Sequence, residues 1–130
     1  MTRFFFHRAS IFGHENIVKV LTPFSKIPNA PDPSGWTPIQ SAAISGYTEV
    51  IKILGPLSKN DPNSPDPEGW TPIQTAALKG HTDIVKILAP LSHKNPNCKN
   101  KTEFSPMYLA KQMGNNEIVS ILKSFKKTTV

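Results

Sequence analysis

The amino-acid sequence predicts an all-α repeat solenoid, a stack of helix-turn-helix units joined by β-hairpin-like turns. The first observation is an internal repeat, in which segments 35–68 and 69–102 agree at 18 of 34 aligned positions. The second is the placement of thirteen prolines, and the third is the apolar pattern between them. Glycines mark the period, because they stand 33, 34 and 34 residues apart, at Gly13, Gly46, Gly80 and Gly114. Such a period is typical of stacked repeats, so the 130 residues are expected to form one domain.

Prolines indicate which residues of each unit are not helical. Five of them fall between positions 56 and 72: Pro56, Pro62, Pro65, Pro67 and Pro72. An α-helix accepts proline only in its first turn, so this stretch is expected to be extended or turn. Residues 72–89 remain, and Gly80 divides them, since glycine readily takes the left-handed conformation that ends a helix. Each unit is therefore predicted to hold two short helices and one long turn.

The first helix of the second unit is predicted to begin at residue 38. Thr37 is a good N-cap, and Pro38 suits the first helical position. Ile39, Ala42 and Ala43 then follow at the i, i+3, i+4 spacing of one helix face. The alanine pair is small enough to let a neighbouring helix approach closely.

The second helix of this unit is predicted to begin at Thr48. Glu49 lies in its first turn, where a negative charge interacts favourably with the helix dipole. Its broad apolar face consists of Val50, Ile51, Ile53 and Leu54. A single unit cannot bury this face alone, so the units are expected to stack on one another.

The segments WTPIQSAAISGYTEVIKIL and WTPIQTAALKGHTDIVKIL resemble the ankyrin repeat, whose signature is T-P-L-H-x-A-A-x-x-G-H. The resemblance covers nearly the whole chain as a single ankyrin-repeat domain. Four units are expected, at about residues 2–34, 35–68, 69–102 and 103–130. The resemblance implies an L-shaped stack with projecting turns, called fingers, and a module that binds proteins without a cofactor.

The chain departs from the family pattern at two kinds of position. The histidine of the first helix is replaced by Gln40, Gln74 and Tyr108, and only His7 keeps it, so the turns need other hydrogen bonds. Pro56 recurs in the next unit as Pro90, late in the second helix, where proline is expected to end or kink the helix.

Catalytic, cofactor and metal sites are not expected, and the predicted function is non-enzymatic. Four histidines fall at unrelated places, and no glycine-rich phosphate loop is present. The single cysteine, Cys98, cannot form an intramolecular disulfide, which favours a reducing, cytoplasmic location without excluding the nucleus. The apolar runs are far shorter than the ~18 residues that a membrane-spanning helix needs.

Aromatic residues after the turn glycines form the first candidate contact set: Trp36, Trp70 and Phe104. The resemblance places this position on the fingers, where family members expose a variable contact residue. Tryptophan is enriched where binding energy concentrates. A residue that repeats unchanged is also often scaffold, so packing on the proline-rich turn stays the alternative.

The ends of the first helices form the second candidate set. The resemblance places them on the concave face: Ile44, Ser45, Leu78, Lys79, Gln112 and Met113. These residues vary between otherwise similar units, as recognition of a specific protein partner predicts. Ordinary solvent exposure is the alternative.

Charge is concentrated at the C-terminal end. Residues 1–85 hold seven basic and seven acidic residues, whereas residues 86–130 hold eight lysines against Glu103 and Glu117. Lys123, Lys126 and Lys127 suggest an alternative partner, a nucleic acid or an anionic membrane, or else a polar cap. At the other end, residues 4–6, which are Phe4, Phe5 and Phe6, suggest self-association or a structural spacer from a longer array.

Overall fold

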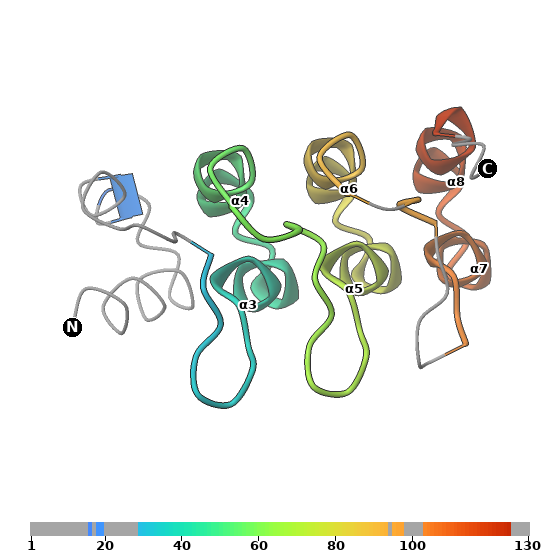
Figure 1. Cartoon of the computed structure of the whole chain (residues 1–130). Helices are drawn as coiled ribbons and strands as arrows, with labels where there is room; N and C mark the ends of the chain where they lie inside the picture. Colours follow the sequence, from blue (N-terminus) through green and yellow to red (C-terminus); the bar gives the residue numbers. More distant parts are fainter. Residues whose placement is uncertain (1–15, 17, 20–28, 94, 98–102, 126–130) are drawn as a thin grey trace.

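The computed structural model describes residues 16, 18–19, 29–93, 95–97 and 103–125. Within these residues six helices form two layers, as Figure 1 shows. The inner layer contains α3 (Pro38–Ser45), α5 (Pro72–Lys79) and α7 (Pro106–Gln112). The outer layer contains α4 (Thr48–Leu54), α6 (Thr82–Leu88) and α8 (Asn116–Ser124). Several residues singled out above lie outside the described residues: Phe4, Phe5, Phe6, His7, Cys98, Lys126 and Lys127.

Helices pack in pairs and in rows. Each inner helix packs on the outer helix that follows it, and the inner helices also pack on one another, α3 on α5 and α5 on α7. The outer helices repeat this contact from α4 to α6 and from α6 to α8. The architecture is therefore an all-α stack of helix pairs, as the repeat predicts.

The inner helices begin and end at the predicted positions. The hydroxyls of Thr37 and Thr71 each accept a hydrogen bond from the backbone N–H three residues on, at 3.1 Å. Ser105 does the same for α7, at 3.1 Å. Gly46 and Gly80 end α3 and α5 with φ of 79° and 78°, which glycine adopts at little cost.

Two of the outer helices, α4 and α6, end where proline requires it. Their last residues are Leu54 and Leu88, two positions before Pro56 and Pro90. Proline cannot donate the next backbone hydrogen bond and would clash with the preceding turn, so the helix stops first. The sequence-based expectation for these prolines is confirmed.

The core runs without interruption between the two layers. Ile39, Ala42 and Ala43 are fully buried, as predicted for one face of α3. Val50, Ile51 and Leu54 are buried on α4, while Ile53 is partly buried and packs against the same cluster. Equivalent residues of the next two units extend this cluster: Ile73, Ala76, Ala77, Ile84, Val85, Leu88, Ile118 and Leu122. Neighbouring units thus bury each other's apolar faces, as stacking requires.

The fingers before α3 and α5 are tight turns organised by an aspartate. The backbone N–H of Asp66 donates to the Trp70 carbonyl at 2.8 Å, which closes the turn. The Asp66 Oδ1 accepts from the backbone N–H groups of Glu68 (2.8 Å) and Trp70 (3.0 Å). Asp32 repeats this arrangement one unit earlier. These hairpin-like turns form without strands in the residues that the structure describes.

An asparagine attaches each finger to its inner helix. The side-chain oxygens of Asn29 and Asn63 accept from the backbone N–H groups of Ile39 and Ile73, both at 2.9 Å. Asn97 accepts from the N–H of Met107 at 2.8 Å. The three bonds each span ten residues and fix where the finger meets the helix.

The glutamines that replace the family histidine connect neighbouring units. The Gln40 Nε2 donates to Asp66 Oδ2 (3.1 Å), in the finger that leads into α5, and to Thr75 Oγ1 (3.2 Å), in α5 itself. The Gln74 Nε2 donates to the carbonyl of Phe104. Side-chain bonds therefore tie each unit to the finger that follows, which is how the hydrogen bonding of these turns differs from the expected histidine pattern.

Candidate partner-binding surface

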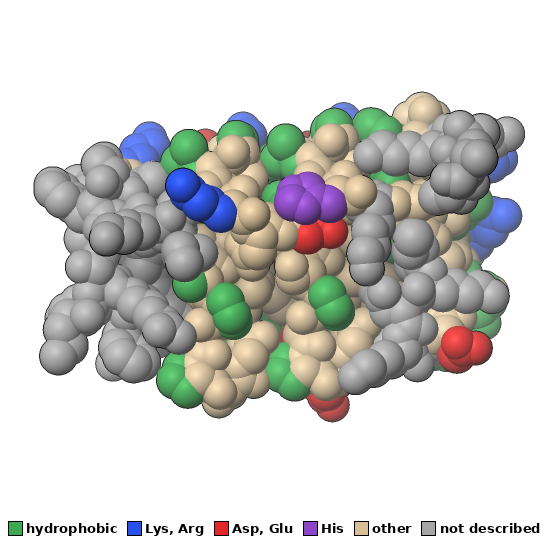
Figure 2. Space-filling model, in the orientation of Figure 1, with side chains coloured by type: hydrophobic (Ala, Val, Ile, Leu, Met, Phe, Trp, Pro, Cys, Tyr) green, Lys and Arg blue, Asp and Glu red, His purple; other side chains and the backbone are tan. Residues whose placement is uncertain are grey.

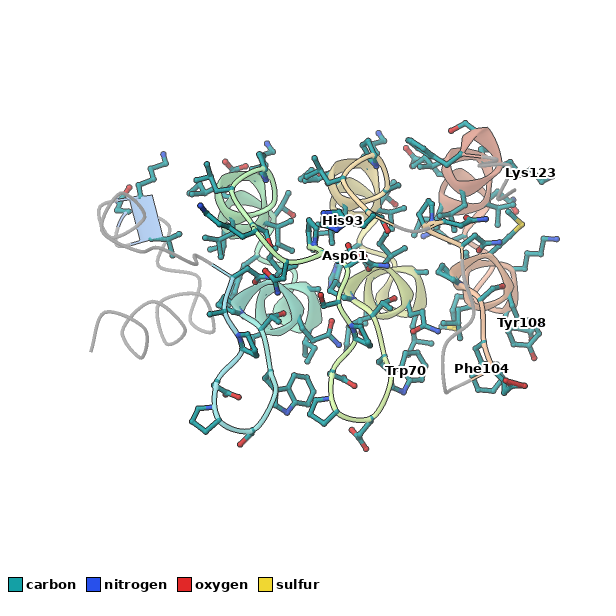
Figure 3. All side chains as sticks on the ribbon, in the orientation of Figure 1. Asp61, Trp70, His93, Phe104, Tyr108 and Lys123 are labelled. Carbon is teal, nitrogen blue, oxygen red and sulfur yellow. The ribbon has the colours of Figure 1, made fainter. Side chains whose placement is uncertain are left out.

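The finger aromatics Trp36, Trp70 and Phe104 lie directly before the inner helices. Trp36 and Trp70 are partly buried, and the Trp70 side chain packs against the core cluster. Figure 3 shows Trp70 and Phe104 on the finger side of the inner layer. Both tryptophans are thus only partly accessible, whereas Phe104 is more open, with 41% of its surface exposed.

The second candidate set forms what we call the inner row, at the C-terminal ends of α3, α5 and α7. It consists of Ile44, Ser45, Leu78, Lys79, Gln112 and Met113, all of them exposed. Three of its members are large apolar side chains, Ile44, Leu78 and Met113, with exposed fractions of 40%, 37% and 59%. The inner helices stack side by side, so the row crosses three consecutive units.

The two sets lie at opposite ends of the inner helices. A helix of eight residues, such as α3 or α5, is about 12 Å long. The structure therefore brings the nine predicted residues together as two rows, one at each end of the inner layer. Both rows depend on hydrogen-bonded helix ends, namely the N-caps Thr37, Thr71 and Ser105 and the terminal glycines Gly46 and Gly80.

Described ion pairs lie on the outer layer rather than on the inner row. Lys52 pairs with Glu49 on α4 at 2.9 Å, and Lys86 of α6 pairs with Glu117 of α8 at 3.4 Å. Among the described residues, Lys79 forms no ion pair with a carboxylate. Its ammonium group is exposed at the end of α5 and can meet an acidic group of a partner.

The two histidines that the structure describes, His81 and His93, have packing or surface positions. His81 lies against Gly46, where an added Cβ would come within 2.8 Å of the imidazole Cε1. The backbone N–H of His93 donates to Asp61 Oδ1 at 3.2 Å, and Figure 3 shows the two residues close together near the centre of the view. Figure 2 shows histidine and acidic side chains, in purple and red, side by side near the centre of the same face. In the part of the chain that the structure describes, no group of three or more His, Cys, Asp or Glu could hold a metal ion. No described helix is long and apolar enough to cross a membrane.

Sequence reasoning missed two features of this surface. Asp32 and Asp66, which order the fingers, were recognisable as a pair because they stand one repeat apart before Gly35 and Gly69. The second feature is a stacked pair formed by Phe104 and Tyr108, with ring centroids 5.4 Å apart and ring planes 11° from parallel. The i, i+4 spacing allows such a contact, but it does not reveal that Tyr108 is exposed.

Comparison with known proteins agrees with this geometry. The family model described as "Ankyrin repeats (3 copies)" matches residues 2–66 and 56–129. No curated protein matches the chain. The two overlapping matches span nearly all of the sequence, and the described helix pairs stack as that family requires. The chain therefore belongs to the ankyrin repeat family.

Proposed function

We propose that the chain binds a protein partner, without catalysis and without a cofactor, through the inner row and the finger aromatics. Ankyrin repeat domains are generally protein-binding modules and typically non-catalytic. The observation that carries the finer proposal is the exposure of Ile44, Leu78 and Met113 at equivalent helix ends of three successive units. A cytoplasmic location, expected from the single cysteine, is part of the same proposal.

Exposed apolar side chains in a row favour association because their burial removes apolar surface from water, at roughly 25 cal/mol per Å². The helix ends beneath the row are fixed by capping hydrogen bonds and by the buried core. Little conformational freedom is therefore lost when a partner binds. Lys79, next to Leu78, adds a charge that selects for a complementary acidic group.

The finger aromatics contribute a second contact line. Phe104 is exposed enough for direct contact with a partner, whereas the Trp70 side chain packs against the core. Truncating Trp70 is therefore expected to lower stability as well as binding, which makes it a poor first probe. The inner row offers cleaner variants because its apolar side chains project from helix ends.

The test uses a partner captured on immobilised wild-type chain, identified by mass spectrometry and then purified. Its affinity for the double variant Ile44→Ala, Leu78→Ala is expected to fall by about tenfold or more, with an unchanged circular dichroism melt. Leu57→Ala is the matched control, because Leu57 is 47% exposed but lies after α4, away from both rows. Equal affinity of wild type and double variant would show that the inner row is not the binding site.

A further inference from the structure

The fourth unit differs from the two before it at three positions on the side that faces away from the third unit. In the second and third units these positions are buried: Gln40 and Gln74, Ala43 and Ala77, Gly55 and Ala89. Two of them face the following unit, since Gln40 donates to Thr75 of α5 and an added Cβ on Gly55 would come within 3.0 Å of Leu91. The fourth unit carries Tyr108, Lys111 and Lys123 there, and all three are exposed.

These three residues and Phe104 form what we call the end face. Tyr108 is 46% exposed and stacks on Phe104, with parallel-displaced rings that leave aromatic surface uncovered. Both residues are held in place, because Gln74 donates to the Phe104 carbonyl and the backbone N–H of Tyr108 donates to the Ser105 cap at 3.1 Å. The aromatic platform is therefore organised before any partner arrives.

Lysines occupy the rest of the end face. Lys111 lies one turn after Tyr108 on α7, so the two side chains are neighbours on that helix. Figure 3 shows Phe104 and Tyr108 on the finger side of this end and Lys123 on the outer-layer side. Neither lysine forms an ion pair with a described carboxylate. The end face thus combines an aromatic platform with two ammonium groups.

The composition of the end face argues against two kinds of binding partner, a further repeat unit and a second copy of the chain. Stacking of another unit like the second or third would bury Lys111 and Lys123, and buried unpaired charges are costly. Symmetric pairing with the end face of a second copy would bring the lysines of both copies together, and like charges repel. An occupant must therefore supply negative charge as well as an apolar group.

We propose that the end face binds an acidic protein segment that carries an aromatic side chain. The aromatic ring of the segment stacks on Tyr108. Separate carboxylates on either side of that ring form ion pairs with Lys111 and Lys123. Exposed Glu103, which precedes Phe104 in the chain, disfavours the continuous phosphate chain of a nucleic acid at this surface. Both arginines of the chain, the residues that most often read nucleic acids, are far away in sequence at Arg3 and Arg8. The proposal does not depend on the inner row.

The experiment is a nitrogen-15 NMR titration of the full chain with a blocked peptide of two glutamates, a phenylalanine and two glutamates. Amide shifts are expected at residues 104–123, and binding should weaken as salt is added. Tyr108→Ala is expected to weaken binding by about 5- to 30-fold. Lys111→Ala with Lys123→Ala, which places the residue of the third unit at both positions, is expected to weaken it by about 3- to 10-fold.

Three controls decide the outcome. Lys59→Ala removes an exposed lysine outside the end face and should leave peptide binding unchanged. The same peptide with glutamines in place of glutamates should bind more weakly and without salt dependence. The proposal is overturned if millimolar peptide shifts no end-face amide, if the shifts map to the inner row instead, or if a ten-thymidine single strand binds as tightly as the acidic peptide.

Discussion

The finger that leads into α5 and the finger that leads into α7 have the same attachment to their helices but different tips. Asn63 and Asn97 both accept a hydrogen bond from the backbone N–H ten residues on, at 2.9 and 2.8 Å. At the tip, Asp66 and Gly69 form the tight turn before α5. Before α7, the position of Gly69 is taken by Glu103, which has φ of 65°. The attachment, rather than the tip, is therefore what every unit needs to start its inner helix.

The contacts between units show why the tip can change. Gln40 donates to the Asp66 carboxylate and also to the main-chain carbonyl of Trp70, at 3.4 Å, and Gln74 donates to the equivalent main-chain carbonyl of Phe104. A main-chain acceptor is present whatever residue occupies the position. The finger before α7 therefore stays hydrogen-bonded to the third unit although it has no aspartate or glycine at the positions of Asp66 and Gly69.

The largest effect is expected from Asp66→Ala. The Asp66 carboxylate is buried and accepts from Glu68, Trp70 and Gln40, so its removal leaves three donors without this partner. We expect the free energy of unfolding to fall by about 2–4 kcal/mol, because each unsatisfied buried donor is costly. Urea unfolding followed by circular dichroism measures this loss.

Glu68→Ala is the control for the same finger. The Glu68 side chain is exposed, so its removal should change the free energy of unfolding by no more than about 0.5 kcal/mol. A similar loss for both variants would mean that the aspartate does not order the tip. The distinction between the two kinds of finger would then lack an energetic basis.

A smaller effect, of opposite sign, is expected from Glu103→Gly. A side chain at positive φ is strained, and glycine removes this strain while adding freedom to the unfolded chain. The net gain should be about 0.5–1 kcal/mol. The converse change, Gly69→Ala, introduces the same strain at φ 92° and should cost about 1–2 kcal/mol. Thermal melts of the two variants should shift in opposite directions, and a shift in the same direction would contradict this explanation.

Local signals in the sequence predict most of the fold. The capping threonines, the prolines after them and the terminal glycines act within a few residues, so the helix bounds follow directly from Thr37, Pro38 and Gly46. The apolar spacing predicts the buried faces for a similar reason, since helical geometry converts it into one side of a cylinder. These predictions are confirmed because each depends on the chain's own neighbours.

The candidate surface was less predictable because it depends on contacts between units. The hydrogen bond from Gln40 to Asp66 joins residues 26 positions apart, and no local sequence pattern predicts it. The part of Trp70 that is buried depends on how its finger meets the core, and the exposure of Tyr108 depends on what lies beyond the fourth unit. The roles of the inner row and the finger aromatics in binding therefore stay predictions.

The smallest effect is expected from Lys86→Ala, which tests whether the outer layer compensates for the altered tip of the last finger. Lys86 and Glu117 join α6 to α8 at 3.4 Å, but their side chains are 53% and 63% exposed. Water and salt screen such a pair, so its loss should lower the free energy of unfolding by about 0.5 kcal/mol or less. Double-mutant cycles with Glu117→Ala at low and high salt measure the coupling. A coupling above about 1 kcal/mol that survives high salt would mean that this outer-layer ion pair holds the fourth unit on the stack together with the buried core and the bond to the Phe104 carbonyl.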